Sequence, residues 1–114
     1  MTPAEELTAG VDQLDGLLAE ATPGPWRVND LDHRSIDAPS RGVVASVAGR
    51  EIWPTPADTA LIVALVNAGP AIATWLREAA TDVRGYEPER APQFFPDELR
   101  VARAILATKE GTGG

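Results

Sequence analysis

Four arginines lie in or beside the segments that we expect to form a small sheet. They are Arg27, Arg34, Arg41 and Arg50. An arginine guanidinium suits bidentate hydrogen bonding to phosphate or carboxylate groups. Because side chains alternate between the two faces of a strand, at least two of these arginines have to share one face to hold such a group. On that condition the pattern indicates binding of an anionic small molecule such as a nucleotide.

The single histidine, His33, stands beside Asp30 and Asp32, and these side chains are possible metal ligands. Ligands crowded into one short polar turn cannot surround a metal ion tetrahedrally, and the sequence offers no second ligand cluster. We therefore interpret the segment as a solvated turn and expect neither a metal nor a cofactor. The chain also lacks a glycine-rich phosphate loop and a G-x-S-x-G nucleophile setting. We predict that the protein is not an enzyme.

A partner-binding surface is the other candidate site. Trp53, between Ile52 and Pro54, is the tryptophan that we expect to be most exposed, whereas Trp26 and Trp75 are expected in the core. Aromatic anchors dominate the energetics of protein interfaces. The last helix adds an apolar stripe, and the polar linker before it allows packing on a neighbouring chain. The predicted partner-binding residues are Trp53, Leu99, Ile105 and Leu106.

The charge balance restricts the class of partner. The formal net charge is −7, with 17 acidic residues against 10 Lys and Arg. Direct nucleic-acid binding normally requires a basic field, so we do not expect it here. The chain has no cysteine, which excludes disulfides and thiolate metal sites. Glu5 and Glu6 stand where a signal peptide would carry bases, so we expect a cytoplasmic protein.

The most apolar stretch runs from residue 55 to residue 83. Thr55 and Asp58 form a capping-box pattern at its start. Pro70 removes a backbone donor and disfavours helical geometry at Gly69, so the sequence predicts two helices, 57–67 and 69–83. A single kinked helix is the alternative. We expect no membrane span, because polar residues and the Gly-Pro pair interrupt the roughly 20 apolar residues that a span needs.

The first helix is predicted to begin at Thr2-Pro3-Ala4-Glu5, which has the pattern of a cap, a proline and an acid. Its apolar positions form a narrow seam of alternating three- and four-residue steps. The seam consists of Ala4, Leu7, Val11, Leu14, Leu18 and Ala21. Gly10 and Gly16 lie off this seam, where each costs about 1 kcal/mol relative to alanine. The helix therefore depends on packing, either on its own chain or on a second copy.

Short strands are predicted over residues 26–29, 35–38 and 43–48, separated by polar and proline-containing turns. Their spacing favours an antiparallel meander whose inner face is covered by the 57–83 helices. A proline-rich linker over 84–93 precedes a C-terminal helix that starts near Pro96. The predicted fold class is α+β: an N-terminal helix, a three-stranded antiparallel sheet, the two central helices and a C-terminal helix. We predict one domain over residues 1–110 and a disordered tail over 111–114.

Two motifs together resemble those of a known family. The first is Ala21-Thr22-Pro23-Gly24-Pro25-Trp26, and the second runs from Ala57-Asp58 through Leu61-Ile62 to Asn67-Ala68-Gly69-Pro70. Their order resembles the Ead-like family of accessory proteins found in temperate phages and in prophages of GC-rich bacteria. The resemblance covers about residues 4–80. Val66 stands where family members often carry a basic residue. The resemblance implies a phage or prophage context and brings no catalytic activity with it.

These observations predict a small acidic, non-enzymatic accessory protein that acts by binding another protein, in host modulation or anti-defence. The alternatives are an anionic-ligand module that uses the sheet arginines and an acidic decoy of nucleic acid that acts on a DNA-binding host protein. We also predict a homodimer, because one face of a small sheet cannot cover the stripes of every helix. The acidic first helix would repel its own copy, so the central or C-terminal helices are the expected contact.

Overall fold

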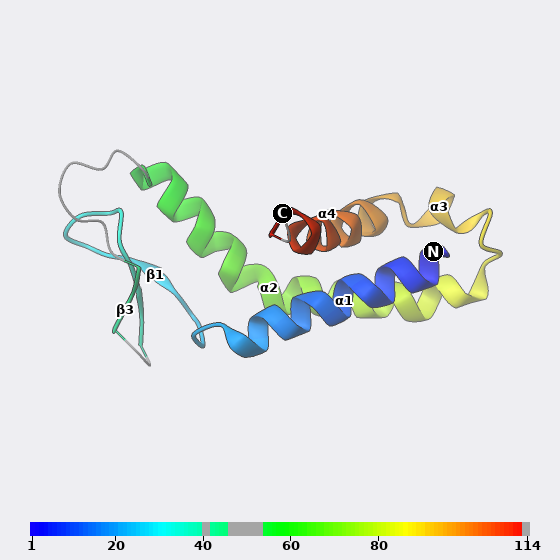
Figure 1. The fold of residues 1–114 in the computed structure, drawn as a ribbon, viewed down its shortest axis with the longest axis horizontal. Helices are drawn as coiled ribbons and strands as arrows, with labels where there is room; N and C mark the ends of the chain where they lie inside the picture. The colour runs from blue at the N-terminus through cyan, green and yellow to red at the C-terminus, as the bar shows by residue number, and fades with distance from the viewer. Residues whose placement is uncertain (40–41, 46–53, 113–114) are drawn as a thin grey trace. The chain divides into compact units, whose positions relative to one another are not determined.

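The computed structural model describes residues 1–39, 42–45 and 54–112 (Figure 1). In chain order the elements are α1 (Pro3–Glu20), β1 (Arg27–Val28), β2 (Ile36–Ala38), β3 (Gly42–Ala45), α2 (Pro56–Asp82), the 3₁₀ turn η1 (Val83–Gly85), α3 (Ala91–Phe94) and α4 (Pro96–Thr112). This order confirms the predicted α+β class. The chain divides into two compact units. The helical unit comprises residues 1–17 and 71–114, and the sheet unit comprises residues 18–70.

Both predicted helix starts are confirmed as reciprocal capping boxes. The Glu5 amide donates to Thr2 Oγ1 and the Thr2 amide donates to Glu5 Oε1, each over 3.2 Å. The same pair of bonds joins Thr55 and Asp58, again over 3.2 Å. Each box satisfies amide donors that the first turn of a helix leaves without an intrahelical acceptor.

The central helix is continuous, which corrects the prediction of two helices broken near Gly69-Pro70. α2 runs from Pro56 to Asp82 with Pro70 in its interior. A proline inside a helix costs about 3 kcal/mol. Full burial of one leucine or valine contributes about 1.5–3 kcal/mol, and α2 buries Val63 and Ala73 on the two sides of the proline. Packing therefore outweighs the local preference for a break.

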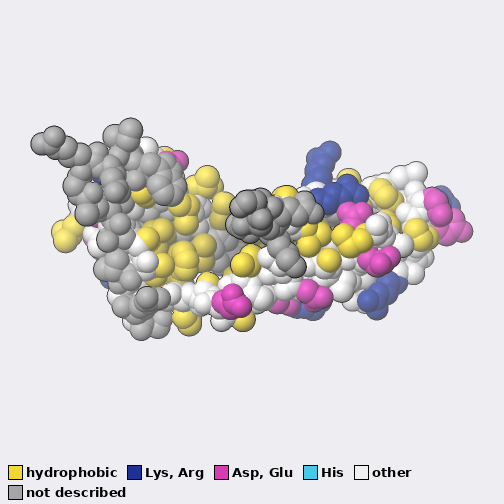
Figure 2. Space-filling view, viewed as in Figure 1, with side chains coloured by type: hydrophobic (Ala, Val, Ile, Leu, Met, Phe, Trp, Pro, Cys, Tyr) yellow, Lys and Arg dark blue, Asp and Glu magenta, His cyan; other side chains and the backbone are white. Residues whose placement is uncertain are grey.

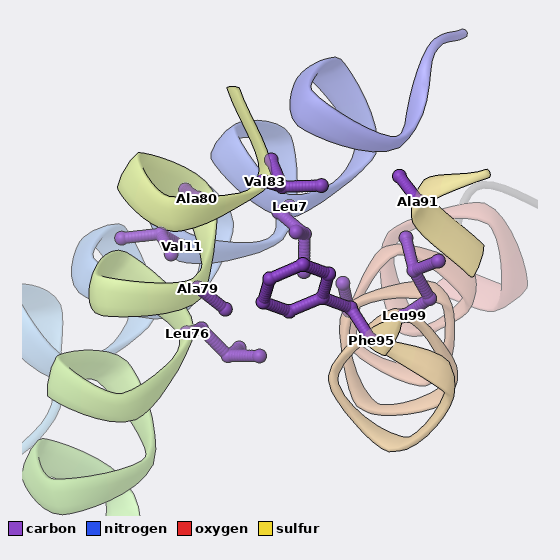
Figure 3. Packing of buried hydrophobic residues seen from close by; sticks show 10 residues of the cluster. Leu7, Val11, Leu76, Ala79, Ala80, Val83, Ala91, Phe95 and Leu99 are labelled. Carbon is purple, nitrogen blue, oxygen red and sulfur yellow. The ribbon is translucent and has the colours of Figure 1, made fainter. Parts of the chain in front are cut away.

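The helical unit has a core of helix packed on helix (Figure 3). The buried members are Leu7, Val11, Leu76, Ala79, Ala80, Val83, Ala91, Phe95, Leu99 and Ala102. They come from α1, the part of α2 after Pro70, η1, and the segment from α3 to α4. Figure 3 shows the Phe95 ring pointing away from Leu99, toward the side chains of Leu76, Ala79 and Leu7. The helical stripes thus cover one another. The 57–83 segment was predicted to cover the sheet, but its part after Pro70 packs in this helical core instead.

Gly10 marks a close approach of α1 to α4. Gly10 is buried, and a Cβ atom placed on it would lie 2.8 Å from the Ala102 Cβ. The ion pair between the Arg103 guanidinium and the Glu6 carboxylate lies one helical turn away on α1 and one residue away on α4. The glycine that the sequence presents as a weak point of α1 is therefore a packing contact.

The sheet unit contains the predicted meander, an antiparallel sheet of three strands in the order β1-β2-β3. β2 carries the buried Ile36 and Ala38. The first half of α2 contributes the buried Val63 and Thr59, and the Thr59 hydroxyl donates to the Arg34 carbonyl over 3.0 Å. This bond ties α2 to the turn before β2, and the helical cover of the sheet by α2 stays a prediction. Residues 46–48 of the predicted third strand lie outside the described residues.

The predicted linker over 84–93 is partly structured. It contains α3 and the exposed Tyr86, whose ring lies 4.8 Å from that of Phe94 and 5.5 Å from that of Phe95. These aromatic contacts fasten the segment to the start of α4. Trp75, expected in the core, is 39% exposed, because Leu76 beside it takes the buried position on α2.

Candidate functional site

The two halves of the family-like motif meet in the sheet unit. A groove of about 300 Å³ lies between the end of α1, the turn after it and the middle of α2. Its lining residues are Leu18, Ala21, Thr22, Pro23, Gly24, Pro25, Val66, Asn67 and Pro70. Most of these side chains are aliphatic or proline rings. The groove therefore presents apolar surface with one amide side chain on its wall.

Asn67 joins the two motif halves directly. Its Oδ1 accepts from the Trp26 amide and its Nδ2 donates to the Trp26 carbonyl, both over 2.8 Å. The asparagine side chain thus pairs with the backbone as a neighbouring strand would. The Trp26 indole Nε1 in turn donates to the Thr22 carbonyl over 2.8 Å. Sequence reasoning assigned Asn67 no role beyond its place in the second motif.

Gly69, another residue of the second motif, is needed for close packing. It is buried, and a Cβ atom on it would lie 2.9 Å from the Leu18 Cδ2. The absence of a side chain lets α2 approach the end of α1 beside the groove. The motif residues Asn67 and Gly69 are thereby explained by the packing of this turn on α2.

The sheet arginines occupy different environments. Arg27 is exposed on β1, and its partner across the ladder is Asp37. The Arg34 Nε donates to the Pro54 carbonyl over 2.8 Å. Arg41 and Arg50 lie outside the described residues. The Asp37 carboxylate next to Arg27 opposes a bound anion by like charge. Binding of an anionic ligand by these arginines stays a prediction.

The turn that carries His33 is built by its acidic and amide side chains. Asp32 accepts from the Ser35 hydroxyl over 2.6 Å and from the Ser35 and Arg34 amides over 2.9 and 3.0 Å. These bonds lower the pKa of Asp32 to about 2, and the bond from the Ser35 hydroxyl has the largest effect. Asn29 Oδ1 accepts from the Leu31 amide over 2.8 Å. Asp32 therefore directs its carboxylate into the turn. Among the residues that the structure describes, no group of three or more potential ligands is arranged to hold a metal ion.

The predicted partner-binding residues differ in how deeply they are buried. Leu99 is 1% exposed and lies in the core of the helical unit. Ile105 and Leu106 are half-buried on α4, and Ile105 packs against that core. Trp53 lies outside the described residues. Leu99 is therefore a core residue and has no surface to offer a partner. Ile105 and Leu106 keep part of their surface exposed.

The largest exposed aliphatic side chains of the sheet unit lie elsewhere. Leu61 and Leu65 on α2 are 59% and 56% exposed, and Leu31 in the turn is 92% exposed. Figure 2 shows hydrophobic side chains gathered over the first half of α2. By length and composition the helical segment Pro56–Gly85 would suffice to cross a membrane, a test that core helices of soluble proteins also pass. Sequence reasoning named the central or C-terminal helices as the expected contact with a second copy and did not predict which residues of α2 are exposed.

Comparison of the chain with family models, with curated proteins and with solved structures gives no match.

Proposed function

We propose that this chain is a small accessory protein of a phage or prophage and acts by binding another protein. The observation that carries the proposal is the exposure of Leu61 and Leu65 on α2, more than half for each side chain. No charged residue occurs between Asp58 and Arg77, and the exposed residues of α2 between Asp58 and Asn67 are all aliphatic: Ala60, Leu61, Ala64 and Leu65. Contiguous apolar surface of this kind marks interaction sites.

The energetic reason is the hydrophobic effect. Covering an exposed leucine side chain contributes up to about 1.5–3 kcal/mol when burial is complete, and the helix presents both leucines one turn apart. More than half of the Leu65 side chain is left exposed by its own chain, so that part of the burial free energy is still unused. A protein partner with a complementary apolar surface gains this free energy on association.

The test is affinity capture from a lysate of a GC-rich bacterium, with the purified chain as bait and mass spectrometry as readout. Leu61→Glu places a charge on the apolar surface of α2. Leu31→Glu is the matched control, because it replaces a more exposed leucine of the same unit outside the helix. We expect one protein to be enriched by the parent chain and by Leu31→Glu, and lost with Leu61→Glu. No enrichment, or equal enrichment by all baits, contradicts the proposal.

Two further measurements separate the alternative functions. In a thermal-shift screen against nucleotides, a shift that saturates with ligand would favour the anionic-ligand module. An acidic decoy of nucleic acid relies on charge, so its complex would weaken steeply as salt is raised. We expect no saturable shift, and a complex that persists in salt because apolar contacts are not screened.

A further inference from the structure

One face of α2 in the sheet unit consists of exposed aliphatic residues alone. We call it the α2 leucine face; its members are Ala57, Ala60, Leu61, Ala64 and Leu65, all exposed. Residues three and four apart lie on the same side of a helix, which places these side chains on adjoining turns. Thr59 and Val63, on the opposite side of the same turns, are buried within the sheet unit. One side of the helix is therefore used by its own unit and the other is not.

We propose that the α2 leucine face is where a second copy of this chain docks, through a two-fold symmetric helix pair. The inference rests on the proposed function in one respect, that this face binds protein, and it adds a second copy as an occupant that competes with the other protein for the face.

The charge distribution favours a second copy at this face. Two chains of net charge −7 repel each other, and the repulsion is smallest where the facing surfaces carry no charge. α1 carries acids at its start and along its length and no base, so two copies of α1 would place like charges together. The α2 leucine face has no ionisable residue, so two copies meet there without opposing charges.

The shape of the face is complementary to itself. Leu61 and Leu65 are large, and Ala57, Ala60 and Ala64 beside them are small. A two-fold interface needs one patch that offers both protrusions and hollows, because the same patch occurs on both sides. In helix packing, side chains of one helix insert between those of the other. The leucines of one copy fit above the alanines of its partner, and the alanines allow the helices to approach closely.

The size of the face sets the expected strength. A pair of helices that meet over about three turns buries less than the roughly 1,200 Å² typical of stable complexes. The dimer is therefore expected to be weak and to dissociate on dilution through the micromolar range.

The experiment is sedimentation velocity on the whole chain over a concentration series, with circular dichroism to establish that each variant is folded. We expect the parent chain and Leu31→Glu to approach twice the chain mass at the highest concentration. The double variant Leu61→Glu/Leu65→Glu is expected to stay monomeric. Mixing it with Leu61→Lys/Leu65→Lys should restore the doubled mass, because opposite charges then face each other whichever way the two helices run.

Three results would overturn the inference. The first is a parent chain that is monomeric at every concentration. The second is a dimer that the folded double glutamate variant leaves intact. The third is co-sedimentation of the parent chain, but not of the variant, with vesicles of mixed zwitterionic and anionic phospholipid, which would assign the face to a lipid surface. A monomer that still captures a lysate protein through Leu61 would remove the dimer and leave the proposed function standing.

Discussion

Replacement of Gly10 by alanine tests the packing of α1 on α4. A Cβ atom at this position would lie 2.8 Å from the Ala102 Cβ and 3.0 Å from the Ala102 Cα. Ordinary contact between carbon atoms begins at about 3.5 Å. One of the contacts is with backbone, so no rotation of a side chain relieves it, and the helices have to separate by about 0.7 Å locally.

Two terms of opposite sign set the magnitude. Alanine gains about 1 kcal/mol over glycine in a helix interior. Overpacking a close contact costs about 1–3 kcal/mol. The net effect of Gly10→Ala is therefore a loss of up to about 2 kcal/mol in the free energy of unfolding. Gly16→Ala on the same helix is the matched control, because a Cβ atom placed on Gly16 would have nothing within 4 Å and only the gain of about 1 kcal/mol applies.

Urea unfolding followed by circular dichroism measures both variants. Because the helix-propensity term is common to them, the difference between the two midpoints reports the overpacking term alone. With a urea dependence of about 1–3 kcal/mol per molar, we expect the midpoints to differ by about 1 M, with Gly10→Ala the lower. In the double variant Gly10→Ala/Ala102→Gly the contact is relieved, so the two substitutions should be less damaging together than the sum of their separate effects.

The refuting result is a Gly10→Ala midpoint equal to or above that of Gly16→Ala. It would mean that α1 and α4 do not meet at Ala102. An additive double variant would lead to the same conclusion, because residues that do not touch do not couple.

Variants at three other positions test further contacts. Asn67→Asp turns the Nδ2 donor to the Trp26 carbonyl into an acceptor and should cost about 1–2 kcal/mol in urea unfolding followed by tryptophan fluorescence; an unchanged midpoint would contradict the pairing. The pKa of Asp32 is lowered on folding, so its stabilising effect is present above its ordinary value of about 3.9 and is lost as pH falls toward about 2. The stability difference between the parent chain and Asp32→Ala should accordingly be constant from neutral pH down to about 5 and shrink below about 4; a difference that persists at the lowest pH would refute the assignment. Tyr86→Ala removes two ring contacts and should lower the free energy of unfolding by about 1–3 kcal/mol, whereas Tyr86→Phe should be close to neutral in the same assay.

Local signals in the sequence were sufficient for the element types. The caps at Thr2 and Thr55 and the β-branched segment before residue 46 depend on neighbours a few residues away, and these predictions are confirmed. The break predicted at Pro70 was wrong because the outcome there is decided by residues far away along the chain. Proline chemistry is local, but the burial that outweighs it comes from residues distant in sequence.

The candidate sites show the same division. The sequence identified the two motif halves and the apolar stretch over residues 55–83. It did not show that Asn67 pairs with Trp26 across 41 positions, or that Leu61 stays exposed while Leu76 is buried. Leu61 and Leu76 both lie in apolar stretches of the same helix, so only contacts with distant segments distinguish the exposed leucine from the buried one.

By itself, then, the sequence of this protein determined the starts of the first and central helices, the meander and the acidic charge, because capping, periodicity and composition act within a few residues. Only the tertiary structure decided which side of each helix is covered. Gly10 is an isolated weak point in the sequence of α1 and becomes a close contact once Ala102 lies beside it. The physical reason is that burial depends on every segment that reaches a surface, and most of those segments are far away along the chain.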